Sequence, residues 1–314
     1  MIPGILRSTA ELVRSLWTRR RLVLDFVGRD LRSRYAGSSL GFFWSVVQPL
    51  ANLAIYMFVF MVVLRARWAD GMSSVEVSLM MLTGFLVWST HAETLSRATN
   101  CVQDNSNLIQ KVVFPAEVLP TYLSLSAMVS LLVGLPIVFA AMLLYSKGLP
   151  NYADAREAFQ ALSMQRAIDD GLDPASVNIG PELGIALPLV MLPLLILLQW
   201  VFTTGVAYLM ATVQVIIRDL QHLVPLLLTV WMFSTPIFYP ATLLPGKHLG
   251  PIPAELVLEL NPMYWLIDSY QRVMLYGLWP QWHLLGRFAV VALVVFALGS
   301  RFLMREKRSF PDLL

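Results

Sequence analysis

Residues 29–49 read RDLRSRYAGSSLGFFWSVVQP and join a basic, helix-forming segment to the first long apolar run of the chain. At about 100° per residue, the side chains before this junction separate onto two faces of a helix. The apolar face consists of Val23, Leu24, Val27, Leu31 and Tyr35, and the opposite face of Arg21, Asp25, Gly28, Arg29 and Arg32. A helix with two such faces lies in the membrane interface instead of crossing the membrane. Two interpretations remain open: a basic anchor for anionic lipid, or a lever between a cytosolic partner and the first span.

The composition is that of a polytopic membrane protein. Apolar residues make up 57% of the 314 residues and charged residues 14%, and the mean hydropathy is +0.65. Soluble domains, by contrast, carry about 25% charged residues. The pI of about 9.1 follows from Lys and Arg gathering at the membrane surface, so it does not indicate nucleic-acid binding. Cys101 is the single cysteine, which excludes an internal disulfide.

Six apolar stretches are predicted to cross the membrane, since about 20 helical residues span its ~30 Å core. They cover about residues 41–64, 77–95, 119–145, 183–213, 223–239 and 284–303. We therefore expect an all-α protein with a transmembrane domain over 37–304, between a cytoplasmic segment, 1–36, and a cytoplasmic tail, 305–314. Residues 1–40 are basic and do not resemble a cleavable signal. With the N-terminus inside, most of the 23 Lys and Arg fall on the cytoplasmic side, which predicts that both termini lie there.

A polar hairpin over residues 97–117 separates the second and third spans. It contains DNSNLIQKVVFP, in which apolar residues recur at helical spacing before Pro115. This segment is predicted to be either a short amphipathic helix outside the membrane or a loop folded back on the lipid surface. A later stretch, 146–182, is acidic and is predicted to be an external loop.

Residues 240–282 are too polar to cross the membrane once, yet they are rich in apolar and aromatic residues. Within this region, Asn261 is expected to cap a helix, Pro262 to occupy its first position and Gly277 to end it. This pattern predicts a pair of re-entrant or interfacial half-helices.

The sequence lacks the motifs that several kinds of chemistry require. No GxxxxGK[ST] occurs, so no P-loop nucleotide site is predicted, and no GxSxG is present. The four histidines are scattered, with no HExxH and no Cys–His cluster, so neither a metal site nor catalytic residues are predicted. The spans also lack the buried carboxylates of a proton-coupled pump. A transporter of this kind would draw its energy from another polypeptide.

Four blocks of the sequence carry a family resemblance. They read RDLRSRYAGSSLGFFWSVVQPL, NSNLIQKVVFP, VQVIIRDLQHLVPLLLTVWMFSTPIFYP and LNPMYWLIDSYQRVMLYG. In this order they resemble the membrane subunits of polysaccharide-exporting ABC-2 type transporters, and most closely the Wzm-type O-antigen permeases, with capsule and teichoic-acid exporters as relatives. The resemblance implies a type V exporter-like fold with six spans, an amphipathic interface helix, a cytoplasmic coupling helix and re-entrant periplasmic gate helices. The long 146–182 loop departs from this pattern.

The same resemblance implies partners and site residues. Two copies of the chain would form a homodimer in the inner membrane, with two cytosolic ATPase subunits that bind ATP and Mg, so this chain would hold no cofactor itself. The substrate would be a lipid-linked polysaccharide. Coupling to the ATPase would involve Asn105, Asn107, Leu108, Ile109, Lys111, Phe114, Arg218 and Asp219. The interface helix would contribute Arg29, Asp30, Arg32, Arg34 and Tyr35.

Aromatic side chains are candidates for the glycan channel and gate, because their rings offer flat apolar faces to sugar C–H groups. The candidates are Phe42, Phe43, Trp44, Trp231, Phe233, Phe238, Tyr239, Tyr264 and Trp265. The alternative for each is an interfacial aromatic belt or helix packing. Two other functions also remain open. One is an ABC-2 exporter of a small lipid or drug, and the other is an integral-membrane enzyme acting on polyprenyl-linked sugars.

Overall fold

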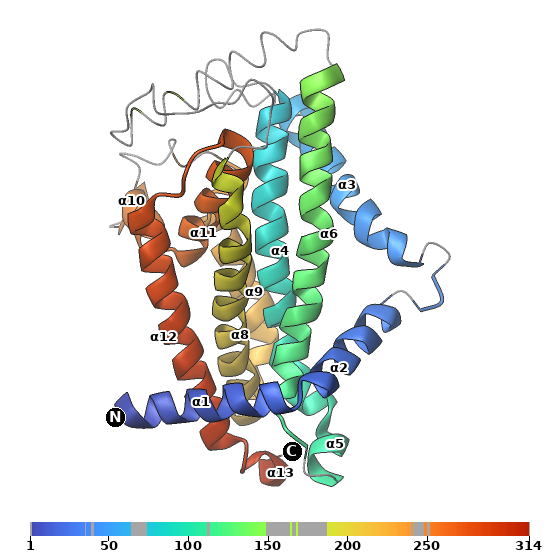
Figure 1. The fold of residues 1–314 in the computed structure, drawn as a ribbon, viewed down its shortest axis with the longest axis vertical. Coiled ribbons are helices and arrows are strands. Elements are labelled where there is room, and N and C mark those ends of the chain that lie inside the picture. The colour runs from blue at the N-terminus through green and yellow to red at the C-terminus, as the bar shows by residue number, and fades with distance from the viewer. Residues whose placement is uncertain are drawn as a thin grey trace.

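The computed structural model describes residues 2–34, 36–38, 41–63, 74–111, 114–148, 187–239, 248–249 and 252–313, and residues 164, 168 and 241 singly. Nearly all the regular structure is helical. The strands β1 (His248–Leu249) and β2 (Ile252–Pro253) form one short antiparallel pair. Long helices stand side by side, and both chain ends lie at the same end of the bundle (Figure 1). The all-α prediction is therefore confirmed in outline.

Four long helices form the body of the molecule: α4 (Ser74–Asp104), α6 (Val118–Gly148), α8 (Leu192–Ile216) and α12 (Trp282–Glu306). A short 3-10 helix, η4 (Leu187–Met191), leads into α8, and the shorter α9 (Leu220–Ser234) packs against α4 and α8. Three stretches of the described residues are long and apolar enough to cross a membrane. They are Val118–Met142, Leu187–Ile216 and Trp282–Glu306. The prediction of a membrane protein is thus confirmed.

Helix α4 is central and unusually polar for its place in the bundle. It packs against α3, α6, α8, α9 and α11. Thr83, Thr90, Thr94 and Thr99 are buried, and each hydroxyl donates to the carbonyl four residues earlier, at 2.7–2.9 Å. Because these polar groups are satisfied within the helix and covered by protein, α4 continues to Asp104. The helix therefore includes the first eight residues of the predicted 97–117 hairpin.

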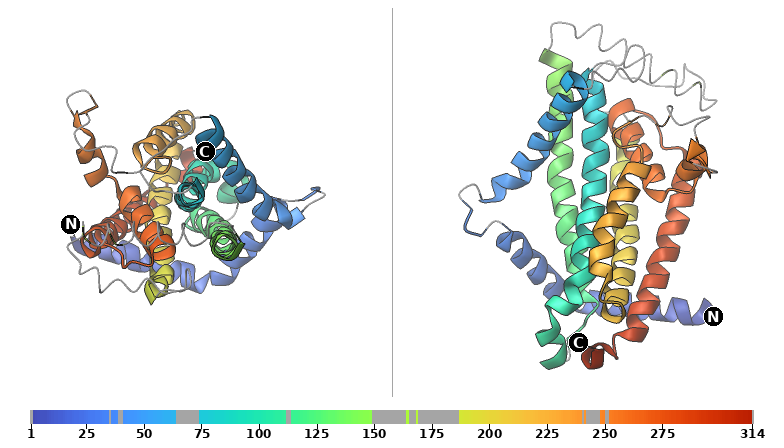
Figure 2. Two further views of the ribbon diagram at one scale, coloured as in Figure 1. Left: turned by 90° about the horizontal axis from the view of Figure 1, so that it is seen from above. Right: turned by 180° about the vertical axis from the view of Figure 1, so that it is seen from behind.

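The first apolar stretch stands apart from the bundle at one end. A 3-10 turn, η1 (Gly41–Phe43), leads into α3 (Trp44–Met57), and the π-helix η2 (Phe58–Val63) continues it. Helix α3 approaches α4 and α6 and diverges from them toward the end where the N-terminal helices lie (Figures 1 and 2). Phe43 of η1 and Trp44 and Leu50 of α3 are exposed.

Two helices precede α3, where the sequence predicted one. Helix α1 (Ile2–Thr18) lies across the end of the bundle, and α2 (Arg20–Ser33) continues obliquely toward α3 (Figures 1 and 2). Leu12 of α1 and Val23 and Val27 of α2 are buried, whereas Leu24, on the predicted apolar face, is exposed. The sequence analysis missed α1, although its apolar residues recur at helical spacing.

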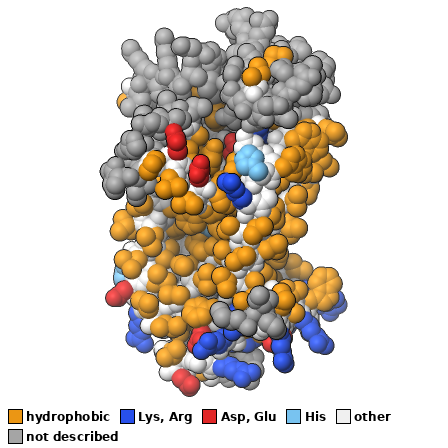
Figure 3. All heavy atoms as spheres, turned by 90° about the vertical axis from the view of Figure 1, so that its left-hand side faces the viewer, with side chains coloured by type: hydrophobic (Ala, Val, Ile, Leu, Met, Phe, Trp, Pro, Cys, Tyr) orange, Lys and Arg blue, Asp and Glu red, His pale blue; other side chains and the backbone are white. Residues whose placement is uncertain are grey.

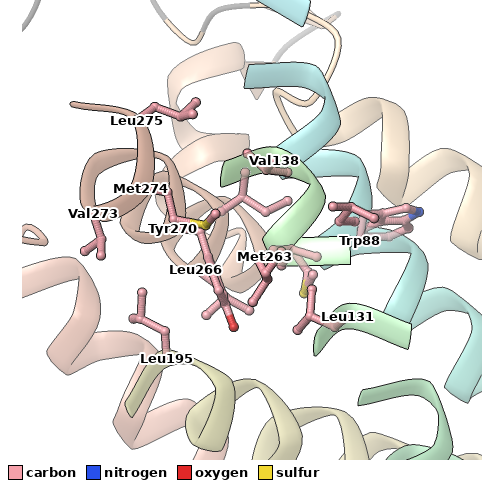
Figure 4. Close-up of a cluster of buried hydrophobic side chains, with 14 of the residues drawn as sticks. Trp88, Leu131, Val138, Leu195, Met263, Leu266, Tyr270, Val273, Met274 and Leu275 are labelled. Carbon is pink, nitrogen blue, oxygen red and sulfur yellow. The ribbon is translucent and has the colours of Figure 1, made fainter. Parts of the chain in front are cut away.

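Three short helices lie near the opposite end: α10 (Ala254–Glu259), α11 (Pro262–Gln271) and the π-helix η6 (Arg272–Tyr276). The predicted helix signals are confirmed: the Asn261 side chain accepts from Met263 N at 3.1 Å, and Gly277 ends η6 with a left-handed φ of 62°. Figure 4 shows Met263, Leu266 and Tyr270 of α11 turned into the core. Helix α11 is buried among α4, α8 and α12.

Helices α8 and α12 approach each other closely through two glycines. A Cβ at Gly205 would lie 2.6 Å from the Phe296 backbone, and a Cβ at Gly299 would meet the carbonyl oxygen of Gly205. Small residues allow such close helix approach in membranes, where van der Waals contact holds helices together. The two glycines thus set the separation of these two helices.

Candidate functional site

One end of the bundle gathers Lys and Arg side chains, and we call it the basic end. Helices α1 and α2, the short α5 (Ser106–Lys111) and the short α13 (Phe310–Leu313) lie there (Figure 1). In the space-filling view, cationic side chains gather at this end, beside a broad hydrophobic band (Figure 3). A membrane protein presents this kind of surface where its spans leave the lipid.

Four charged residues connect α2 to α4 at the basic end. Arg34 Nε lies 3.0 Å from Asp30 Oδ2, and Arg34 Nη2 lies 2.6 Å from Glu93 Oε1. Arg97 Nη1 lies 3.2 Å from the same Glu93 oxygen, and Arg97 also pairs directly with Asp30. Two carboxylates and two guanidinium groups thus alternate across the junction. We call this set the α2–α4 charge cluster.

Asp30 is the most buried member of the α2–α4 charge cluster. Burial alone would raise the pKa of its carboxyl, but hydrogen bonds and charge from Arg97 and Arg34 outweigh that effect and hold the pKa below its ordinary value. The carboxylate is therefore ionised at neutral pH. Asp30 pairs with Arg34, four residues later, and with Arg97 of α4, 67 residues later. The pair with Arg97 therefore fixes α2 to the bundle.

A second charged site surrounds Glu117, just before α6. Its carboxylate is 1% exposed, accepts a hydrogen bond from Ser15 Oγ at 2.5 Å, and lies 3.2 Å from Lys307 Nζ and 3.9 Å from Arg19 Nη1. Burial would raise the pKa of Glu117, but the Ser15 hydrogen bond and the Lys307 charge lower it overall. This site, which we call the Glu117 site, joins α1, α6 and the end of α12.

The predicted coupling segment divides into anchoring and exposed residues. Asn105 Nδ2 donates to the Cys101 carbonyl at 2.8 Å, Ile109 is buried, and the Phe114 ring lies 5.8 Å from the Phe26 ring of α2. Asn107 and Leu108 face outward from α5. The segment is thus a short helix attached to α4 and α2, with an exposed outer face. The Lys111 side chain lies outside the described part of the chain.

The turn between α8 and α9 contains the other two predicted coupling residues. Arg218 and Asp219 are both exposed. The Arg218 carbonyl accepts from Gln214 Nε2 at 3.0 Å, and the same amide nitrogen lies 3.3 Å from Gln103 Oε1 of α4. These bonds attach the turn to Gln103, near the end of α4. Gln103 directly precedes Asp104, the last residue of α4, and is close in sequence to α5.

The predicted interface-helix residues have two different environments. Asp30 and Arg34 belong to the α2–α4 charge cluster, whereas Arg29 and Arg32 are exposed. The Arg29 guanidinium lies 4.7 Å above the centre of the Phe26 ring, and Arg32 Nε donates to the Gly28 carbonyl at 3.0 Å. Tyr35 lies outside the described residues. The helix therefore uses one pair of charges for attachment and leaves another pair available at the surface.

The aromatic channel candidates also differ in exposure. Trp231 packs edge-on against Trp88 at 5.7 Å and His91 at 5.2 Å, and Trp265 is buried. Phe43, Trp44 and Phe233 are exposed; Phe238 is half-buried, its ring 5.1 Å from Tyr56. Tyr239 and Tyr264 are half-buried, and the Tyr239 hydroxyl donates to the Phe233 carbonyl at 2.8 Å. The Phe42 side chain is outside the described part of the structure.

Sequence reasoning missed several residues that the structure brings together. They include Arg97, Glu117 and Lys307 of the two charged sites, and His91, whose Nδ1 lies 2.9 Å from Thr203 Oγ1 in the bundle core. The i, i+4 spacing of Glu93 and Arg97 was the one local signal available. Among the described residues, no group of three or more His, Cys, Asp or Glu is placed to hold a metal ion.

These features define the class: a helical membrane protein whose N-terminal amphipathic helices are fixed by ion pairs to one end of the bundle. Comparison with known proteins is more specific. Residues 23–161 match the family model described as ABC-2 type transporter. The chain is 28% identical to the O-antigen export system permease protein RfbA of Myxococcus xanthus, over 96% of this chain and 98% of that relative. Two Klebsiella pneumoniae proteins with the same description are 24% and 22% identical, over 82% and 93% of this chain and 81% and 95% of each relative.

The matches confirm the family resemblance drawn from the sequence. The chain resembles the membrane subunit of an ABC-2 type transporter and, within that class, the O-antigen export permeases. This resemblance favours a transporter membrane subunit over an enzyme.

Proposed function

We propose that this chain is the channel-forming permease subunit of an ABC transporter that exports a lipid-linked polysaccharide across the inner membrane. The observation that carries the proposal is the match along nearly the whole chain to proteins described as O-antigen export permeases. An O-antigen-like glycan on a lipid anchor is accordingly the proposed substrate.

Energy for export would come from ATP hydrolysed in two separate cytosolic subunits, which would bind ATP and Mg. The arrangement of the basic end supports this role. Helix α5 presents Asn107 and Leu108 outward, while Asn105 attaches it to α4 and Phe114 contacts α2. A push on α5 would therefore reach both α4 and the N-terminal helices. Arg218 and Asp219 would add a second contact.

Six helical segments would cross the membrane: α3 with η2, α4, α6, η4 with α8, α9 with the residues after it, and α12. Helix α9 has 15 residues and so measures about 22 Å, less than the ~30 Å core, which is why the segment to Tyr239 is included. The membrane domain would cover 37–304, with 1–36 and 305–314 in the cytoplasm. Both ends of the chain lie at the basic end, as this topology requires (Figure 1). Helices α10 and α11 with η6 would be the periplasmic gate.

Two copies of the chain would enclose the channel between their α3 and α9 helices. The exposed rings of Phe43, Trp44 and Phe233 would offer stacking faces for sugars, since apolar ring contacts are non-directional and let a polymer slide. Trp231 and Trp265 would instead support the residues that line the channel without contacting the glycan, because both are packed in the protein.

Co-purification tests the proposal directly. We expect the tagged chain to bring down the ATP-binding subunit encoded with it, in a complex of two permeases and two ATPases. Leu108→Asp should weaken this complex about tenfold or more, because the exposed Leu108 would be buried against the ATPase in the complex and the variant would place a charge there. Leu256→Asp, at an exposed leucine of α10, is the matched control and should leave the complex unchanged. Absence of any ATPase partner would overturn the proposal.

A further inference from the structure

Helix α13 lies against the predicted coupling helix although about 200 residues separate them in sequence. Figures 1 and 2 show α5 and α13 next to each other at the basic end, and close backbone contacts join them. Phe310, the first residue of α13, is 0% exposed and belongs to the same buried cluster as Ile109 of α5. The coupling helix therefore has a packing partner near the end of the chain.

A helix as short as α5 needs such a partner. Its six residues form about one and a half turns, and isolated helices shorter than about 12 residues are marginal in water. Asn105 attaches the start of α5 to α4, but the buried side of the helix is covered by the cluster around Phe310 and Ile109. The position of α5 thus depends on where α13 sits.

The Glu117 site fixes α13 in turn. Lys307, three residues before Phe310, pairs with the buried Glu117 carboxylate at 3.2 Å. Backbone hydrogen bonds from Ser309 N to the Glu306 carbonyl and from Asp312 N to the Ser309 carbonyl turn the chain into α13. Glu117 also holds Ser15, so the same carboxylate connects α13 with α1.

We propose that Phe310, held in place by the Lys307–Glu117 ion pair, is a positioning residue for the coupling helix α5. The coupling role of α5 rests on the proposed function, whereas the packing of Phe310 against α5 does not. With Phe310 in place, α5 transmits force from the ATPase to α4 as a rigid element. With the ring removed, α5 loosens and ATP hydrolysis no longer drives export efficiently.

Hydrogen exchange of the purified permease in lipid nanodiscs tests the packing without any partner. In Phe310→Ala, amides of residues 106–111 should exchange at least about tenfold faster, which corresponds to about 1.4 kcal/mol of local stability. Phe310→Leu should restore slow exchange, and Leu313→Ala, at an exposed residue of the same helix, should have no effect. Lys307→Met should loosen α5 in the same direction, with rescue by Lys307→Arg. Unchanged exchange at 106–111 in both Phe310→Ala and Lys307→Met would overturn the proposal.

Transport coupling is then measured on the whole complex, with the ATP-binding subunit encoded beside this chain. We expect Phe310→Ala to keep ATP hydrolysis but to lower the export of lipid-linked glycan per ATP several-fold, and Phe310→Leu to recover it. Normal export per ATP in a variant whose α5 has loosened would overturn the positioning role. If the wild-type chain binds no ATPase at all, the proposed function fails, whereas the exchange experiment still decides the packing.

Discussion

Asp30 contributes to stability through its ionised form, so its effect depends on pH in a defined direction. Its pKa is lowered in the folded protein, so its contribution is complete above the unfolded value of about 3.9 and is lost as the pH falls through the folded value. We expect Asp30→Asn to lower the unfolding free energy by about 1–3 kcal/mol at pH 7, because it leaves two arginines with one carboxylate. The difference from wild type should shrink as the pH drops below about 4.

The measurement for Asp30 is thermal unfolding in detergent between pH 3 and pH 7. Asp25→Asn is the matched control, because Asp25 lies on the same helix and is exposed. A constant gap between Asp30→Asn and wild type across this range would show that the charge of Asp30 is not what stabilises the junction.

The side-chain amide of Asn261 makes several hydrogen bonds at once. The oxygen accepts from Met263 N at 3.1 Å and from Trp231 Nε1 at 3.0 Å, and the nitrogen donates to Thr235 Oγ1 at 2.8 Å. Asn261→Ala should cost about 2 kcal/mol, since it removes a helix cap and leaves the half-buried indole N–H of Trp231 without its acceptor. Trp231→Phe should cost less, and the double variant should cost less than the sum because the two residues share a bond. Chemical unfolding of the four proteins measures this, and additive costs would refute the shared bond.

At the scale of helices, the separation of α8 and α12 depends on glycine. Gly205→Ala should lower the unfolding free energy by about 1–3 kcal/mol, since the new methyl group would lie 2.6 Å from backbone atoms of Phe296, which cannot rotate away. Gly286→Ala, in the same pair of helices, meets nothing within 4 Å and should stabilise by up to about 1 kcal/mol through helix propensity. Thermal unfolding in nanodiscs measures the stabilities of the two variants against wild type. Equal stabilities of the two variants would contradict the close approach.

The sequence predicted the apolar helices well, because their signal is local. Hydropathy located α6, α8 and α12, and the Asn261, Pro262 and Gly277 signals were confirmed around α11 and η6. The extension of α4 to Asp104 was not predictable in the same way, since its polar residues are tolerated only because neighbouring helices bury them. The sequence analysis overlooked α1 because its arginines lower the hydropathy of the segment, although one face of the helix is apolar.

The charged sites could not be predicted from sequence, because their members are distant along the chain. Asp30 and Arg97 are 67 residues apart, and Lys307 and Glu117 are 190 apart. No periodicity brings such pairs together; only the packing of helices distant in sequence does, α2 against α4 for the first pair and the end of α12 against the start of α6 for the second. The coupling, interface and aromatic residues stay predictions, although the structure now separates those that anchor helices from those that face outward.

At the scale of the whole molecule, α9 is one of the helices that the rest of the chain covers least among the described residues. Of residues 220–234, Val224 alone is fully buried, while Leu226, Leu227, Val230 and Phe233 are exposed. The polar residues Gln221, His222 and Thr229 of this helix are exposed as well. Helix α12 also exposes His283 and Arg287 near its start, but its exposed residues between Phe288 and Ser300, namely Val290, Leu293, Val294 and Leu298, are all aliphatic, as a lipid-facing surface requires. Helix α9 therefore has the mixed surface of an element that meets another protein or a substrate.

This contrast predicts which helix would face the second copy of the chain in the proposed homodimer. In a Cys101→Ser background, which removes the buried native thiol, Thr229→Cys should form a disulfide-linked dimer in membranes under mild oxidation. Leu293→Cys should stay monomeric under the same conditions, because its helix would face lipid. Disulfide formation needs Cα atoms within about 7 Å, so cross-linking at Thr229 would place two α9 helices in direct contact on the dimer axis. Cross-linking at Leu293 and none at Thr229 would put α12 at the interface and remove α9 from the channel.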